Sequence, residues 1–304
     1  MSTPTDSSWT AAQSHRGKGL IMKIDAHHHL FDFSQDPYTW IEGDAMAPIK
    51  RDFDMRDLRS AIQGTDITHT ILVHATGNHQ ETHNMLDLAA QDEMVVAVVG
   101  WLDVQSADSI SACDKYLAHP AAHYLKGIRD IAQDNPNPNY LSTDQAIATV
   151  RAIGKRGLVY EILTKTPELK AGIDLVRACP DMQFVLDHIS KPYISRQEFE
   201  PWKSLITELA KFPNVACKIS GLVTEAHWQN WKVSDFTPYI DHIIESFSPA
   251  RLIFGSDWPG SAAWRKKLCR DCSPCRICHS KPLADEKRGF WSENARSLYK
   301  ITNL

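Results

Sequence analysis

The sequence predicts a (β/α)₈ TIM barrel, in which eight parallel strands close into a cylinder and helices cover its outside. Eight short apolar runs recur along the 304 residues, and most of them are separated by a segment with helical periodicity. The run at 94–101 is apolar on both faces, as is typical of a parallel strand covered by helices. An open, doubly wound sheet is the competing fold, but no glycine-rich turn follows the first run.

The barrel is expected to fill one domain at 21–304, after a polar segment at 1–20 that is expected to form a disordered tail. The first strand is expected to run through Ile24 to His29, and an extended loop containing Pro and Gly follows it at 36–53. We expect the other strands at 70–74, 94–101, 125–129, 158–163, 184–188, 215–220 and 251–257. We expect helices at 54–63, 81–89, 144–155, 167–178, around 202–209 and at 239–247.

Composition and charge exclude several classes of protein. Hydrophobic residues make up 43% of the chain and charged residues 23%, which is ordinary for a globular protein. The net charge is −4 and no basic run stands out, so we expect no nucleic-acid partner. No apolar stretch approaches the roughly 18 residues that cross a membrane. Three of the seven cysteines are scattered through the body of the chain, which favours reduced thiols in a cytoplasm.

Polar residues stand at the ends of several expected strands. His27 and His29 are two apart, so they point to the same side if the first strand continues through them. Burying several unpaired charges costs several kcal/mol each, so a packed core would not select such residues. In a barrel these strand ends meet at one mouth and predict a site there. The other residues of this kind are His74, Arg129, Glu161, His188, Lys218 and Asp257. Trp40 and Arg51, from the loop after the first strand, are expected at the mouth of the pocket.

Five motifs carry a resemblance to a known family. They are Asp25-Ala26-His27-x-His29, Gly127-Ile128-Arg129, Leu186-Asp187-His188 followed by Lys191-Pro192, Lys218-x-Ser220-Gly221 and Gly255-Ser256-Asp257-Trp258-Pro259, and the agreement returns at 292–299. In this order they resemble the amidohydrolase superfamily. Within it, the chain is similar to the sugar-acid lactonases that act on L-fuconolactone or L-rhamnonolactone, which are related to 2-pyrone-4,6-dicarboxylate lactonase.

The resemblance implies which residues form the centre of the active site and how many metal ions they could bind. The implied catalytic and metal-binding residues are His27, His29, His188 and Asp257. Many members of the superfamily add a carboxylated lysine on strand 4 or 5 to bridge two metals, whereas this chain has Arg129 and Glu161 there. A bridged two-metal site is therefore not expected. The resemblance implies either one divalent ion, with Zn²⁺ favoured, or no required metal.

The activity that the resemblance implies is the opening of a small sugar lactone, a carboxylic ester. We expect Asp257 to take a proton from the attacking water, while the three histidines stabilise the negative oxygen directly or through one ion. Arg129, Trp40, Arg51, His74 and Lys218 are the expected substrate contacts. There is no Gly-x-Ser-x-Gly turn to supply a nucleophile. A metal-dependent decarboxylase and a cysteine-rich metal-binding protein remain as alternatives, and the oligomeric state stays open.

The segment 260–282 departs from the pattern of the family. Cys269, Cys272, Cys275 and Cys278 are spaced as Cys-x₂-Cys-x₂-Cys-x₂-Cys, which by itself suggests an iron–sulfur or zinc site. The segment lacks the apolar periodicity of the helix that should follow strand 8, and the agreement with the family returns by about Phe290. Compensating frame errors in the coding sequence, a remodelled surface loop and a metal site all remain open, but an iron–sulfur cluster is not favoured.

Overall fold

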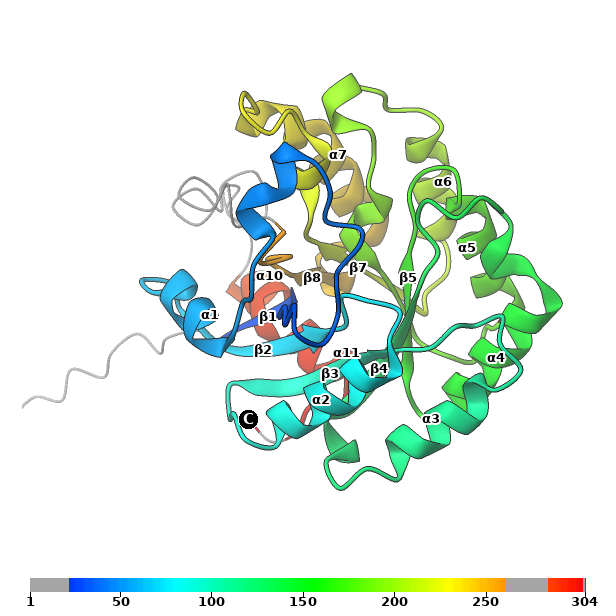
Figure 1. The fold of residues 1–304 in the computed structure, drawn as a ribbon. Coiled ribbons are helices and arrows are strands. Elements are labelled where there is room, and N and C mark those ends of the chain that lie inside the picture. The colour runs from blue at the N-terminus through cyan, green and yellow to red at the C-terminus, as the bar shows by residue number, and fades with distance from the viewer. Residues whose placement is uncertain (1–21, 261–283, 303) are drawn as a thin grey trace, which may run out of the picture.

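The computed structural model describes residues 22–260, 284–302 and 304, and it contains an eight-stranded barrel. All eight strands are parallel and each pairs with the next one along the chain (Figure 1). They are β1 Lys23–His28, β2 Ile67–Val73, β3 Val95–Trp101, β4 Leu125–Ile131, β5 Val159–Leu163, β6 Phe184–Leu186, β7 Val215–Ile219 and β8 Leu252–Phe254. The predicted fold class is therefore confirmed.

The barrel closes between β1 and the segment that follows β8. The backbone N–H of His29 donates to the carbonyl of Trp258 at 2.7 Å, and the N–H of Asp257 donates to the carbonyl of His27 at 2.8 Å. These two bonds tie the motif at 25–29 to the motif at 255–259 through the main chain. The positions of His27, His29 and Asp257 are thus set by the same hydrogen bonds that complete the cylinder.

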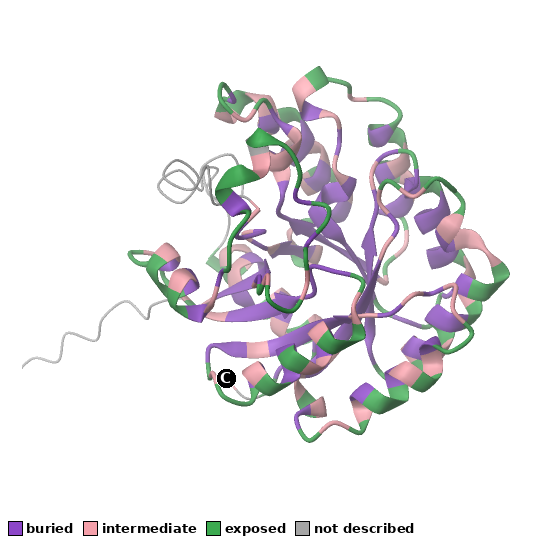
Figure 2. Ribbon diagram, viewed as in Figure 1, coloured by how far each residue is buried: buried purple, intermediate pink, exposed green. Residues whose placement is uncertain are grey.

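Helices cover the outside of the barrel, and the strands behind them are buried (Figures 1 and 2). The helices between strands are α1 Met55–Ile62, α2 His79–Ala89, α3 Ser109–Leu117, α4 Asp144–Lys155, α5 Leu169–Ala178, α6 Trp202–Leu209 and α7 Val233–Phe247. Two short helices, α10 Ala284–Arg288 and α11 Asn294–Leu298, follow β8 in the described part of the chain. From the C-terminal segment, Ala295, Tyr299 and Ile301 pack into a buried apolar cluster with strand residues such as Ile71 and Val185.

Two helices differ from the expectation. The helix α3 is not among the expected elements because its sequence mixes small and polar residues, although Cys113 and Tyr116 are fully buried. The helix α7 begins at Val233 rather than at 239, because the Asp235 side chain accepts the backbone N–H of Lys232 and caps the turn ahead of the internal proline. Neither difference changes the strand ends that form the site.

Parts of the prediction lie outside the described residues. They include the tail expected at 1–20 and the cysteine-rich segment after Gly260, with Cys269, Cys272, Cys275 and Cys278. The three described cysteines, Cys113, Cys179 and Cys217, are buried free thiols. None of the helices that the structure describes is both long enough and apolar enough to span a membrane.

Candidate active site

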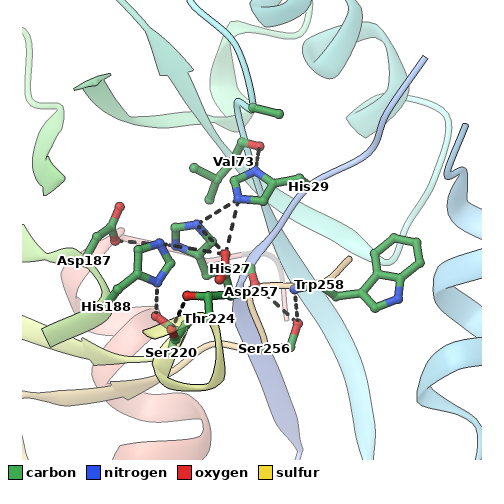
Figure 3. Close-up of polar contacts among 12 residues, drawn as sticks. His27, His29, Val73, Asp187, His188, Ser220, Thr224, Ser256, Asp257 and Trp258 are labelled. Carbon is green, nitrogen blue, oxygen red and sulfur yellow. Dashed lines mark hydrogen bonds and ion pairs between the residues drawn. The ribbon is translucent and has the colours of Figure 1, made fainter. Parts of the chain in front are cut away.

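The two histidines of β1 meet at the mouth of the barrel. His27 and His29 are buried, and their Nε2 atoms lie 3.2 Å apart (Figure 3). The Nδ1 of His29 is 2.8 Å from the carbonyl oxygen of Val73. Because a carbonyl only accepts, Nδ1 of His29 carries the proton, and in the neutral ring the lone pair is on Nε2. The hydrogen bond therefore orients one acceptor nitrogen towards the centre of the site.

His188 and Asp257 complete this centre from the segments that follow β6 and β8. β6 ends at Leu186 and β8 at Phe254, so both residues lie just beyond strands that the sequence predicts to run through them. The Oδ1 of Asp257 lies 3.5 Å from Nε2 of His29, 3.8 Å from Nε2 of His188 and 3.9 Å from Nε2 of His27. Three imidazoles from two strand ends thus converge on one carboxylate oxygen of Asp257 (Figure 3).

A glycine makes room for this convergence. Gly221, just after β7, has a φ of 64°, which favours glycine. A Cβ at this position would lie 2.6 Å from Nδ1 of His188 and 3.0 Å from Oδ2 of Asp257. The adjacent Ser220 hydroxyl lies 2.9 Å from Nδ1 of His188 and fixes the orientation of that ring. The Ser220-Gly221 part of the β7 motif therefore packs directly against His188 and Asp257.

Arg129 lies beside the histidines and is itself held in place by hydrogen bonds. Its Nη1 is 3.0 Å from Oδ2 of Asp187 and 3.2 Å from Nε2 of His27. Its Nε donates to Nε2 of His74 at 3.0 Å, while Nδ1 of His74 donates to the carbonyl of Thr76 at 2.9 Å. His74 is fully buried and acts as a support for Arg129.

A buried ionic network lies beneath the centre. The Nζ of Lys218 is 2.7 Å from Glu161, 3.2 Å from Asp187 and 3.3 Å from Nδ1 of His27. The Tyr299 hydroxyl donates to the other carboxylate oxygen of Glu161. Lys218, Glu161 and Asp187 are all fully buried, so this network supports the ring of His27 from inside the barrel.

The surroundings set the charge of the two groups that face each other. Burial lowers the pKa of His188 to about 4, against the opposing influence of Asp257, so the ring is neutral at pH 7. Burial alone would raise the pKa of Asp257, but the neighbouring His188, His29 and His27 together hold it below its usual value. Asp257 is therefore an ionised carboxylate beside neutral imidazole.

The site opens into a cavity of about 400 Å³. His29, His188, Asp257 and Arg129 line its base, and Trp40 lies on its wall. The other lining residues are Met46, Pro48, Ile49, Ala75, Ile131, Gln133, Asp134, Leu163, Lys165, Lys191, Thr224, Glu225, Trp228 and Gly260. The volume is within the range of cavities that bind small molecules.

Three of the expected substrate contacts do not reach this cavity. The Arg51 guanidinium stacks on Phe53 and pairs with Asp57 at 3.3 Å on the outside. His74 and Lys218 have no exposed surface, because they are enclosed by Arg129 and by the carboxylates beneath the site. We therefore assign His74 and Lys218 to positioning, and leave Arg51 out of the site.

Other residues near the site had no role assigned from sequence. The Asp187 carboxylate contacts Arg129, Lys218 and His27. Its position next to His188, at the end of β6, is the feature of the sequence that could have indicated a role in the site. Lys191 and Trp228 line the cavity from loops, where no strand pattern indicates the direction of a side chain.

The donor set fits one divalent ion. His27, His29 and Asp257 each offer an atom, and these atoms lie within 4.8 Å of one another; His27, Asp187 and His188 form a second such group. Two imidazole nitrogens and one carboxylate are a common zinc set, and the Val73 carbonyl orients His29 as a backbone partner orients a metal ligand. The Arg129 guanidinium, 3.2 Å from His27, is a nearby positive charge that opposes tight binding.

Comparison with known proteins agrees with this geometry. The chain is 31% identical over 294 residues to an L-fucono-1,5-lactonase from Burkholderia ambifaria, covering 93% of this chain and 97% of the relative. It is 30% identical over 306 residues to an L-fucono-1,5-lactonase from Burkholderia multivorans, covering 92% and 96%. A crystal structure of an amidohydrolase from B. multivorans with bound zinc superposes with a TM-score of 0.83 at 28% identity, covering 92% of this chain and all of the other. Residues 24–301 match the amidohydrolase family, and the chain belongs to that family.

Proposed function

We propose that the protein is a hydrolase that opens a neutral sugar lactone of the L-fucono-1,5-lactone or L-rhamnonolactone type. The observation that carries the proposal is the position of the Asp257 carboxylate at the base of the cavity, 3.5 and 3.8 Å from the Nε2 atoms of His29 and His188, where its neighbours hold its pKa below the usual value. Such a carboxylate can remove a proton from water, and the L-fucono-1,5-lactonases that the chain resembles act on an ester of this kind.

Asp257 takes a proton from water as the water oxygen bonds to the ring carbonyl carbon. The carbonyl oxygen becomes negative, the ring C–O bond then breaks, and the proton passes to the departing ring oxygen to give a hydroxyl. A positioned base contributes typically about 10²- to 10⁴-fold, and each donor to the negative oxygen adds roughly 3–4 kcal/mol. Because Nδ1 of His29 donates to the Val73 carbonyl, the neutral form of the ring offers no proton at Nε2, so Arg129 at the cavity base is a better direct donor.

The donor set at the base allows one ion to assist. His27, His29 and Asp257, with His188 beside them, are the residues that would hold it. A bound Zn²⁺ would act as a Lewis acid on the carbonyl. The residues of the chain orient the substrate and move the proton in either case, and the proximity of Arg129 to His27 favours an ion that dissociates readily.

The charges of the cavity favour a neutral substrate. Two of its cations are already paired, Arg129 with Asp187 at 3.0 Å and Lys165 with Asp134 at 2.7 Å. The carboxylate of Glu225 also lines the wall. A substrate with several carboxylates would meet these acids, whereas the hydroxyls of a sugar can bond to both kinds of charged group. The decarboxylase alternative has less support, because the relatives of about 30% identity are lactonases.

A proton-release assay tests the proposal. Ring opening yields an acid, so a pH indicator should report turnover of L-fucono-1,5-lactone or an L-rhamnonolactone with kcat/KM of at least about 10⁴ M⁻¹s⁻¹, the lower end of typical enzymes. Each lactone is measured with and without a chelator, and activity that is lost and then restored by Zn²⁺ identifies a required ion. Rates equal to spontaneous hydrolysis for every aldonolactone, with and without added Zn²⁺, contradict the proposal.

A further inference from the structure

Lys191 lies on the wall of the active-site cavity, three residues after His188. It is partly buried, and no strand or helix of regular geometry leads to it. The four residues 188–191 have φ values of 52°, 49°, 59° and 43°. The chain thus makes a left-handed turn, defined here as residues 188–191, between β6 and the loop that follows it.

The left-handed turn is costly and is held by contacts from outside it. This conformation is unfavourable for residues other than glycine, and the β-branched Ile189 is especially unsuited to it. Nε1 of the fully buried Trp202 donates to the carbonyl of Ile189 at 2.7 Å, and the hydroxyl of Ser190 lies 2.9 Å from that of Thr164. Strain maintained by surrounding structure is typical of functional sites. Its consequence here is that His188 and Lys191 face the same cavity.

Lys191 differs from the other cations of the cavity. Arg129 pairs with Asp187 and Lys165 pairs with Asp134. For the Lys191 ammonium, the described part of the chain supplies neither an ion pair nor a hydrogen bond. Its charge nevertheless acts on the catalytic centre, since Lys191 is one of the groups that lower the pKa of His188, after burial.

The reaction creates a negative charge that requires a partner in this cavity. When water adds to a lactone and the ring C–O bond breaks, the proposed reaction converts a neutral ester into a carboxylate, a hydroxyl and one released proton. The carboxylate of Glu225, on the cavity wall, repels the new carboxylate. A cation without a carboxylate partner stabilises it, first as the carbonyl oxygen becomes negative and then as the product anion.

We propose that Lys191 binds the lactone carbonyl oxygen as it becomes negative and then holds the carboxylate of the product. This inference rests on the proposed lactonase function and adds a catalytic residue to it. The left-handed turn places Lys191 on the wall of the cavity that His188 also lines.

The test compares Lys191→Met with Lys191→Arg, using L-fucono-1,5-lactone for turnover and its hydrolysis product L-fuconate for binding by calorimetry. We expect Lys191→Met to lose about 100-fold in kcat/KM, most of it in kcat, because one charged donor to the transition state is removed. L-Fuconate affinity should fall at least about tenfold, and Lys191→Arg should recover part of both losses because it keeps the charge. Lys211→Met, an exposed lysine after α6 and outside the cavity, is the matched control and should behave as wild type.

The outcomes separate this inference from the function on which it rests. If the wild type turns over the lactone and kcat/KM of Lys191→Met lies within about threefold of it, a change of under about 0.7 kcal/mol, Lys191 does not have this role and the lactonase function stands. If neither the wild type nor any variant turns over the lactone, the lactonase function itself is wrong. Equal binding of L-fuconate by wild type and Lys191→Met, whether tight or undetectable, overturns the role of Lys191 independently of turnover. Thermal unfolding of each variant establishes that it is folded.

Discussion

The Asp257→Asn variant is expected to fold normally and to lose lactone turnover, with kcat lower by at least about 100-fold. The amide has the size of the carboxylate but cannot take a proton from water. The backbone bond from Asp257 N–H to the His27 carbonyl, which helps to close the barrel, does not involve the side chain. Turnover by proton release and unfolding by circular dichroism are measured together.

A matched control for this variant is Asp181→Asn. Asp181 is exposed and lies just before β6, at the end of the barrel opposite the catalytic mouth. The Asp181→Asn variant should retain the wild-type rate. It therefore distinguishes the loss of the carboxylate at position 257 from the loss of one negative charge elsewhere. An Asp257→Asn variant that keeps more than about a tenth of the rate, a loss below roughly 1.4 kcal/mol, means that Asp257 is not the base.

The Lys218→Met variant is expected to lose about 3–5 kcal/mol of unfolding free energy, the usual cost of breaking a buried ion pair. The ammonium lies 2.7 Å from Glu161 and 3.2 Å from Asp187, and all three side chains have no exposed surface. Removing it leaves two buried carboxylates with less positive charge. Urea unfolding followed by tryptophan fluorescence measures the loss, and a change under about 1 kcal/mol would show that the network is not held by Lys218.

The loss should also grow with pH. Burial and the charge of Asp187 raise the pKa of Glu161 to about 7 in the folded protein, and removing Lys218 raises it further. A folded-state pKa above the unfolded value adds stability at low pH that is lost as pH rises through the folded pKa. The Lys218→Met defect should therefore be larger at pH 8.5 than at pH 6. Adding Glu161→Gln should recover part of it at pH 8.5, whereas a pH-independent loss contradicts the assignment.

The central residues of the site could be predicted because strand ends in a barrel have only one place to meet. His27, His29, His188 and Asp257 each follow or end an apolar run, so the fold class alone brings them together at one mouth. The closed order of the eight strands followed from the alternation of apolar runs and helices in the same way. The local sequence pattern and the topology of the barrel were therefore sufficient to predict both the central residues of the site and the order of the strands.

The depth of each side chain could not be predicted in this way. Lys218 and His74 lie on or next to strands, as predicted, but whether a polar side chain meets substrate or another charge depends on partners from distant strands. The direction of Arg51 depends on its stacking over Phe53. Lys191 lies in a left-handed turn that local propensity disfavours and that Trp202 holds from α6. Tertiary contacts decide all four placements.

A crystal structure of the Asp257→Asn variant with L-fucono-1,5-lactone tests most directly whether these residues surround the reacting carbonyl. We predict the lactone in the cavity lined by His29 and His188, with its carbonyl carbon about 3–3.5 Å from a water held by the side chain at position 257. A lactone bound outside this cavity, or bound inside it with its carbonyl turned away from position 257, would contradict the mechanism.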